Sequence, residues 1–285
     1  MTGTSTPSGG PRATNTPTPF DDAERRIWSG RAPAYARTYA QLCAHPVPAL
    51  LDAARVPPGA RVLDVGCGSG TVSAAALARG AAAVHAVDAE PGMVEVTRRA
   101  VPDADVRVGR LPELPYADSS FDAVLGNFVL NHVGRPLAAL AELRRITRPG
   151  GRVAVTIWRA PGAPGQTLIG RAAQAAGLTR PYWLPALAPE DAFPRTPEGL
   201  AALFGTAGFL EAECVELAWE HLSGAGEWWA GAEQGIGAIG QVLNSRGAEG
   251  VAEARRAYDG LCAAFRSADG TLVLPHLALL AAGTA

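Results

Sequence analysis

Acidic and glycine residues near position 66 have the spacing of a nucleotide-like binding site. Residues 61–70 read Arg-Val-Leu-Asp-Val-Gly-Cys-Gly-Ser-Gly, so Asp64 precedes three glycines at alternate positions. A glycine turn between a strand and a helix lets a ligand approach bare backbone and aims the helix N-terminus at it. The carboxylate of Asp64 can accept hydrogen bonds from a cationic amine. Asp88 ends the next apolar segment, where an acid is placed to accept from two ribose hydroxyls.

The segments that must position these residues alternate between apolar runs and amphipathic runs. Strands are expected at 62–65, 84–87, 105–108, 121–126, 152–158, 211–219 and 271–280, and helices at 71–78, 91–100 and 136–146. Strand and helix in alternation indicate a parallel sheet covered on both faces. The prediction is an α/β fold with a Rossmann-like, seven-stranded, mostly parallel sheet, a helical N-terminal cap and lid insertions.

Composition shifts divide the chain into five parts. Residues 1–19 are rich in Thr, Ser, Gly and Pro and are predicted to be a disordered tail. Residues 20–58 form the helical cap, 59–158 the ligand-binding core, and 159–195 a Pro-rich insertion with little periodicity. Residues 196–285 complete the sheet. They include a helix after Thr196-Pro197 and a helical lid at about 221–268.

The overall composition excludes several classes of function. The chain has 285 residues, 48% of them hydrophobic, and a net charge of −2, which argues against a general nucleic-acid or membrane-surface binder. No apolar run approaches the roughly 20 residues of a membrane span, and no secretory signal is recognisable. The four cysteines are widely spaced, which fits reduced thiols and predicts a cytoplasmic protein. All 25 basic residues are arginine, which excludes Schiff-base chemistry.

The glycine spacing resembles the class I S-adenosylmethionine-dependent methyltransferases. Nicotinamide-binding Rossmann folds place their third glycine where this chain has Thr71. Two further signatures of the subgroup related to ubiquinone and menaquinone biosynthesis methyltransferases follow in order. The first is Leu-Pro-Tyr-Ala-Asp-Ser-Ser-Phe-Asp at 114–122, and the second is Leu-Arg-Arg-Ile-Thr-Arg-Pro-Gly-Gly at 143–151, one residue longer than the usual pattern.

The resemblance implies that S-adenosyl-L-methionine is the cofactor and S-adenosyl-L-homocysteine the product. The implied cofactor-binding residues are Tyr35, Asp64, Gly66, Cys67, Gly68, Asp88, Ala89, Met93, Arg110, Leu111 and Asn127. Structural alternatives stay open for Asp88 as a helix cap, Met93 as packing and Tyr35 as a cap anchor. Arg110 departs from the family, which often has an aspartate there. A guanidinium has no acceptor, so adenine recognition would rest on stacking and on backbone near Leu111.

Histidine and aromatic residues supply the candidates for catalysis and for acceptor binding. His132 follows the fourth expected strand and is the best candidate for a general base, with packing as the alternative. His221 is a second candidate, and His276 is expected to lie away from the site. Tyr182, Trp183, Trp228 and Trp229 could form an aromatic wall for a small acceptor, or bury the lid against the sheet. No metal-ligand spacing is present, so no metal is predicted.

These observations predict methyl transfer to a small organic acceptor in specialised, natural-product metabolism by in-line displacement. The main alternative is a relative that binds the same cofactor but catalyses a cyclisation or rearrangement. A nicotinamide oxidoreductase and a non-enzymatic interaction module are further alternatives. No nucleic-acid or membrane partner is predicted. Nothing in the sequence distinguishes oxygen, nitrogen or carbon as the acceptor atom, or a monomer from an oligomer.

Overall fold

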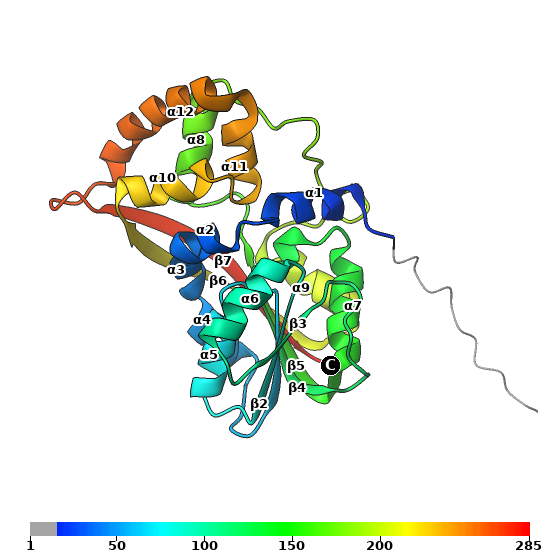
Figure 1. Cartoon of the computed structure of the whole chain (residues 1–285). Helices are drawn as coiled ribbons and strands as arrows, with labels where there is room; N and C mark the ends of the chain where they lie inside the picture. Colours follow the sequence, from blue (N-terminus) through cyan, green and yellow to red (C-terminus); the bar gives the residue numbers. More distant parts are fainter. Residues whose placement is uncertain (1–15) are drawn as a thin grey trace, which may run out of the picture.

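A seven-stranded sheet forms the centre of the protein, and the computed structural model describes residues 16–285 of it (Figure 1). The strands are β1 Arg61–Val65, β2 Ala83–Asp88, β3 Asp105–Val108, β4 Phe121–Asn127, β5 Thr147–Trp158, β6 Leu210–Ser223 and β7 Leu272–Thr284. Their order is β3-β2-β1-β4-β5-β7-β6. β7 is antiparallel to both of its neighbours, and the other pairs are parallel. The predicted Rossmann-like, mostly parallel sheet is therefore confirmed.

The strand order reverses between β1 and β4, and this reversal creates the place where the candidate site forms. Parallel strands end at the same edge, and ligands in open α/β sheets bind in the crevice beyond that edge, at the reversal. Asp64 is near the end of β1, Asp88 is the last residue of β2, and Asn127 is the last residue of β4. The topology thus brings these three predicted residues to one edge of the sheet.

Helices cover both faces of the sheet (Figure 1). Val62 packs on the side of α4 (Val47–Ala53) and α5 (Thr71–Ala78), in a cluster with Leu50 and Val72. Its neighbour Leu63 points the other way and packs with α7 (Pro136–Ile146) and α9 (Pro197–Thr206). Successive strand residues therefore bury side chains in two cores, which explains why the strands read as continuous apolar runs. The remaining core helix is α6 (Pro91–Ala100), which contacts β2 and β3.

The N-terminal cap consists of α1 (Pro19–Trp28), α2 (Ala32–Arg37) and α3 (Tyr39–Ala44), followed by α4. The tail predicted for 1–19 falls mostly on residues 1–15, which lie outside the described residues. At the C-terminal end of this tail the prediction of disorder is wrong, because Thr18 is the N-cap of α1. The Thr18 side chain accepts from the Asp21 N–H, and the Asp21 side chain accepts from the Thr18 N–H. This capping box satisfies backbone donors that the helix would otherwise leave free.

The lid comprises α8 (Leu168–Ala175), α10 (Ala225–Glu233), α11 (Gly237–Leu243) and α12 (Gly247–Leu261). The prediction of little periodicity in 159–195 is wrong for α8, which buries Leu168, Ile169, Ala172 and Ala173 in the lid core. β6 and β7 are longer than predicted and extend from the sheet to the lid (Figure 1). Within residues 16–285, no helix is both long and apolar enough to cross a membrane.

Candidate active site

The glycine turn after β1 requires residues without side chains. Gly66, Gly68 and Gly70 all have positive φ, between 55° and 84°, a conformation that L side chains rarely adopt. A Cβ on Gly66 would lie 2.7 Å from Cγ2 of Val129, and one on Gly68 would lie 3.2 Å from Cε1 of Tyr35. The backbone N–H groups of Gly66 and Cys67 donate to the Val87 carbonyl, at 2.8 and 3.0 Å. The turn is thus held tightly between β2, the segment after β4, and the cap.

Asp64 lies beneath this turn and is 1% exposed. Its Oδ2 accepts hydrogen bonds from the N–H and the hydroxyl of Ser73, at 3.0 and 2.7 Å, so it also caps the start of α5. Its Oδ1 is buried and has no hydrogen-bond partner among residues 16–285. Burial raises the pKa of Asp64 to about 7, although the two bonds from Ser73 oppose the shift. A cationic donor at Oδ1 would give this oxygen a hydrogen-bond partner and would favour the charged form of the carboxyl group.

Asp88 is oriented by backbone donors on both of its carboxylate oxygens. Oδ2 accepts from the Gly68 N–H at 3.0 Å, and Oδ1 accepts from the Glu90 N–H at 2.9 Å. Burial raises the pKa of Asp88, and these N–H groups and nearby His132 offset the shift only in part. Each oxygen keeps a free lone-pair direction, so the carboxylate can still accept from two hydroxyls. The helix-cap alternative and the ribose role are therefore compatible.

The other residues that the resemblance implied surround these two acids in different ways. Tyr35 packs over Gly68 and edge-on to Trp28, with ring centroids 5.7 Å apart. Asn127 donates to the Cys43 carbonyl at 2.7 Å and accepts from the Thr156 hydroxyl at 2.7 Å, so it ties the cap to β5. The remaining implied residues are buried Cys67 and Met93, partly buried Leu111, and exposed Ala89 and Arg110.

These residues fit the cofactor that the resemblance implies. The unpartnered Oδ1 of Asp64 suits an amino group, and the free lone pairs of Asp88 suit hydroxyls. A side chain at Gly68 would press against the ring of Tyr35, so glycine at this position lets the cap pack closely on the turn. Burial raises the pKa of the Cys67 thiol, so this side chain is neutral at pH 7 and packs in the turn.

Sequence reasoning missed Glu24, which contacts His132 directly. Glu24 is 8% exposed, and its Oε2 lies 2.8 Å from His132 Nδ1 and accepts from the Trp28 indole at 3.2 Å. His132 also packs edge-on to Trp28, with ring centroids 5.2 Å apart. With Nδ1–H donating to Glu24, the lone pair of the neutral ring is on Nε2. The signal available in the sequence was an acid on the apolar face of a helix, beside Ala23 and Ile27.

The predicted wall of four aromatic side chains does not form. Tyr182 is 99% exposed, and Trp183 is 39% exposed, because the loop between α8 and α9 is anchored by Leu184 against Ala23 and Ile27. Trp229 is 1% exposed and packs against Tyr258 inside the lid, so for this residue the packing alternative describes the structure. Trp228 instead faces a group of histidines. His276, expected to lie away from the site, is part of that group.

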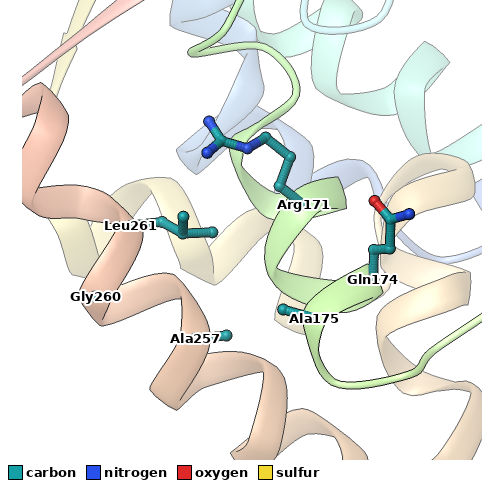
Figure 2. Close-up of a pocket in the computed structure, with 6 residues that line it drawn as sticks. All are labelled: Arg171, Gln174, Ala175, Ala257, Gly260 and Leu261. Atoms are coloured by element: carbon teal, nitrogen blue, oxygen red, sulfur yellow. The ribbon is translucent and has the colours of Figure 1, made fainter.

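A hollow on the lid surface lies between α8 and α12, lined by Arg171, Gln174, Ala175, Ala257, Gly260 and Leu261 (Figure 2). None of these residues belongs to the candidate cofactor or acceptor set. The hollow also has no contribution from the glycine turn or from the strand ends. We therefore do not assign it to the active site.

Comparison with known proteins agrees with this geometry. Residues 63–155 match a family model described as a methyltransferase domain. The chain is 44% identical over 112 residues to a demethylmenaquinone methyltransferase of Renibacterium salmoninarum, covering 39% of this chain and 47% of that protein. It is 41% identical over 132 residues to a ubiquinone biosynthesis O-methyltransferase of Xanthomonas campestris, covering 43% and 55%. The chain thus spans about half the length of the curated relatives it matches.

Solved structures share the fold at low sequence identity. The YcgJ protein of Bacillus subtilis superimposes with a TM-score of 0.55 at 19% identity, over 84% of this chain and 97% of that chain. The [4+2]-cyclase SpnF superimposes with a TM-score of 0.50 at 20% identity, over 87% and 82%. Residues 63–155 thus match a methyltransferase domain, and this part of the chain is similar to class I S-adenosylmethionine-dependent methyltransferases of quinone biosynthesis. S-adenosylmethionine is the cofactor of this family.

Proposed function

We propose that the protein transfers a methyl group from S-adenosylmethionine to a small organic acceptor in specialised metabolism, without a metal ion. The observation that carries the proposal is the buried Oδ1 of Asp64 beneath the glycine turn, which has no hydrogen-bond partner among residues 16–285. An acceptor specific to this chain is supported by the extent of the family match, which ends at residue 155. The lid helices lie beyond that match, so the relatives' acceptors do not carry over.

The residues of the chain would act mainly by binding and orientation. When bound, S-adenosylmethionine supplies a methyl group already activated on a sulfonium, so alignment and exclusion of water matter more than a Lewis acid. Asp64 would hold the amino group, Asp88 would hold the ribose hydroxyls, and Tyr35 would cover the glycine turn. Each contact fixes one end of the cofactor relative to the edge of the sheet, where the acceptor must approach.

Titration calorimetry with S-adenosylmethionine and S-adenosylhomocysteine tests the cofactor site. Asp88→Ala should weaken both by about 30-fold or more, because hydrogen bonds to a charged group contribute about 1.5–3 kcal/mol each. Asp105→Ala is the matched control, since Asp105 is an exposed acid at the start of β3 and should leave the affinity unchanged. Absence of binding to the wild-type protein, or equal affinity in Asp88→Ala, would refute the cofactor assignment.

We propose His132 as the general base for acceptors that must lose a proton. Glu24 would hold Nδ1–H, so that Nε2 accepts the proton. With an acceptor that gives turnover in an S-adenosylhomocysteine release assay, His132→Ala should lower kcat about 100-fold or more without changing cofactor affinity. Glu24→Gln should lower kcat less, and His85→Ala, which alters a histidine on β2, should leave it unchanged. Near-normal turnover of His132→Ala would reduce this histidine to a packing role.

The release assay also separates methyl transfer from the alternative chemistry. If the protein binds S-adenosylmethionine tightly but releases no S-adenosylhomocysteine while consuming an acceptor, the cyclisation or rearrangement alternative is favoured. Formation of S-adenosylhomocysteine with a methylated product supports the proposed transfer.

A further inference from the structure

An arginine on the loop between α8 and α9 lies near the candidate base without forming an ion pair. Arg195 directly precedes Thr196, which caps α9 by accepting from the Gly199 N–H at 3.2 Å. The Arg195 carbonyl accepts from the Ala160 N–H at 3.2 Å, two residues after the end of β5. Because β5 is the parallel neighbour of β4, these bonds place Arg195 at the edge of the sheet where the candidate active site forms.

The same loop is held against the cap and against the segment that carries His132. Leu184 is 3% exposed and packs on Ile27 of α1, beside which the loop passes (Figure 1). Phe193 packs on the core that includes Val133, the residue directly after His132. Two apolar contacts therefore fix the position of the loop relative to the candidate base.

The guanidinium of Arg195 is half-buried and has no close counter-charge. Among residues 16–285 it forms no hydrogen bond and no ion pair, and Glu24 is the charged residue that acts on it. Burial lowers the pKa of Arg195, and Glu24 offsets this shift only in part. Oε2 of Glu24 instead contacts His132 at 2.8 Å and Trp28 at 3.2 Å. A partly desolvated cation whose nearest carboxylate is engaged with other groups can bind a further anion.

The candidate base and this cation lie on two sides of one carboxylate. Glu24 contacts His132 directly and acts on Arg195 from a greater distance. The His132 side chain is 34% exposed, so its ring is accessible to a ligand, and the contact with Glu24 leaves Nε2 to take a proton. A ligand that reaches both residues therefore needs one group that binds a guanidinium and a second group that approaches Nε2 of His132.

The charges of these three side chains favour an anion with a single charge. With Glu24 ionised, His132 neutral and Arg195 positive, the sum of the three charges is zero. When His132 takes a proton from the acceptor, one positive charge is in excess, and a bound carboxylate cancels it. A phosphate dianion would instead leave an excess negative charge beside Glu24, which is unfavourable in a partly desolvated site. The two oxygens of a carboxylate also match the planar fork of a guanidinium.

We propose that Arg195 binds a carboxylate group of the acceptor and thereby determines which small molecules the enzyme accepts. The proposal rests on the proposed function, since it names the substrate class of the same site. The carboxylate serves for binding and is not itself methylated. The methyl group goes to another atom of the acceptor. As the bond from that atom to the methyl carbon forms and the bond from that carbon to sulfur breaks, the proton of the acceptor atom moves to Nε2 of His132.

Formate, the smallest carboxylate, tests this assignment in the protein saturated with S-adenosylhomocysteine. Proton NMR resolves the imidazole signals of the five histidines, and the His132 signal is identified by its absence from His132→Ala. We expect formate to shift this signal with half-saturation below about 100 mM, the affinity that a hydrogen bond to a charged group supplies. Formamide, a neutral molecule of similar size, and chloride at equal ionic strength should leave the signal in place. The signal of His85 on β2 is the internal reference.

Arg195→Gln should bind formate about tenfold more weakly or worse, because the amide carries no charge, while its affinity for S-adenosylhomocysteine is unchanged. Arg195→Met, which keeps a long side chain without the charge, should show the same loss and decides the case if Arg195→Gln fails to fold. Arg171→Gln alters an exposed arginine on α8 and is the matched control. With an acceptor that gives turnover, Arg195→Gln should raise KM about tenfold or more with little change in kcat, the reverse of His132→Ala.

The two proposals fail in different ways. If S-adenosylhomocysteine binds but formate leaves the His132 signal unshifted, or shifts it equally in wild type and Arg195→Gln, the carboxylate assignment is overturned and the proposed function stands. If S-adenosylhomocysteine does not bind, the proposed function fails first, and the carboxylate assignment that rests on it fails as well.

Discussion

The affinity of the protein for S-adenosylhomocysteine is expected to fall about 50-fold between pH 7 and pH 5, with little change above pH 8. Burial raises the pKa of Asp64 to about 7, so the cofactor-free protein carries a mostly protonated carboxyl at pH 5. The amino group of the ligand is a cation and requires the carboxylate. Each pH unit below 7 therefore costs about tenfold in affinity, until the pKa of Asp64 in the complex is reached.

Proton release provides a second and independent measurement of the same linkage. Calorimetric titration at pH 7 in two buffers of different ionisation enthalpy should detect about half a proton released for each ligand bound. Asp64→Asn keeps an oxygen for Ser73 but does not titrate, so it should bind more weakly and lose most of the pH dependence. Burial also raises the pKa of Asp88, which acts in the same direction, so the difference between wild type and Asp64→Asn isolates Asp64. A wild-type affinity that is flat from pH 8 to pH 5 would exclude the proposed contact with the amino group.

The cofactor half of the site could be predicted because its signals are local. Three glycines at alternate positions, an acid two residues before them, and a strand ending in Asp88 all lie within one βαβ unit. Local rules also predicted the helix at 71–78 and the short strand at 105–108 with the bounds that the structure has. Such segments are specified by their own apolar pattern and by the glycine or proline residues at their ends.

The contacts of His132, His45 and His276 could not be predicted, because they join residues far apart in the chain. Glu24 and His132 are 108 positions apart, and the position of Glu24 depends on how α1 docks on the segment after β4. The stacking of His45 on Trp219 depends on the register of β6 with β7, which no short pattern encodes. His276 looks like an ordinary strand residue until Trp219 is placed opposite it. Aromatic residues in loops were a poor guide, since Tyr182 is almost fully exposed.

In the cofactor-free protein, the substitutions His276→Phe and Asp64→Asn are expected to change the pH dependence of the free energy of unfolding in opposite directions. The pKa of His276 is lowered by burial from its ordinary value of 6.5 to about 4. Between these values the unfolded imidazole binds more proton than the folded one, so the free energy of unfolding decreases as pH falls. At about 1.36 kcal/mol per pKa unit, the full effect of this histidine is about 3 kcal/mol.

Asp64 has the opposite sign, because its pKa is raised from 3.8 to about 7. The folded carboxyl keeps its proton where the unfolded one has released it. The contribution of Asp64 to the free energy of unfolding is fully present below pH 3.8 and is lost as pH rises through 7. The loss amounts to about 4 kcal/mol at most. Between pH 4 and pH 6.5 the effects of His276 and Asp64 on the free energy of unfolding therefore largely cancel in the wild-type protein.

Each variant removes one of the two titrating groups and leaves the other. For His276→Phe, the free energy of unfolding should decrease as pH rises from 4.5 to 6.5, and for Asp64→Asn it should increase over the same range. Equilibrium urea unfolding at the two pH values measures both slopes, and His85→Phe serves as a control for removing a partly exposed histidine. If the profiles of both variants run parallel to that of the wild type, neither group titrates as its burial requires. The protonated carboxyl of Asp64, on which the pH dependence of the proposed cofactor contact depends, would then be excluded.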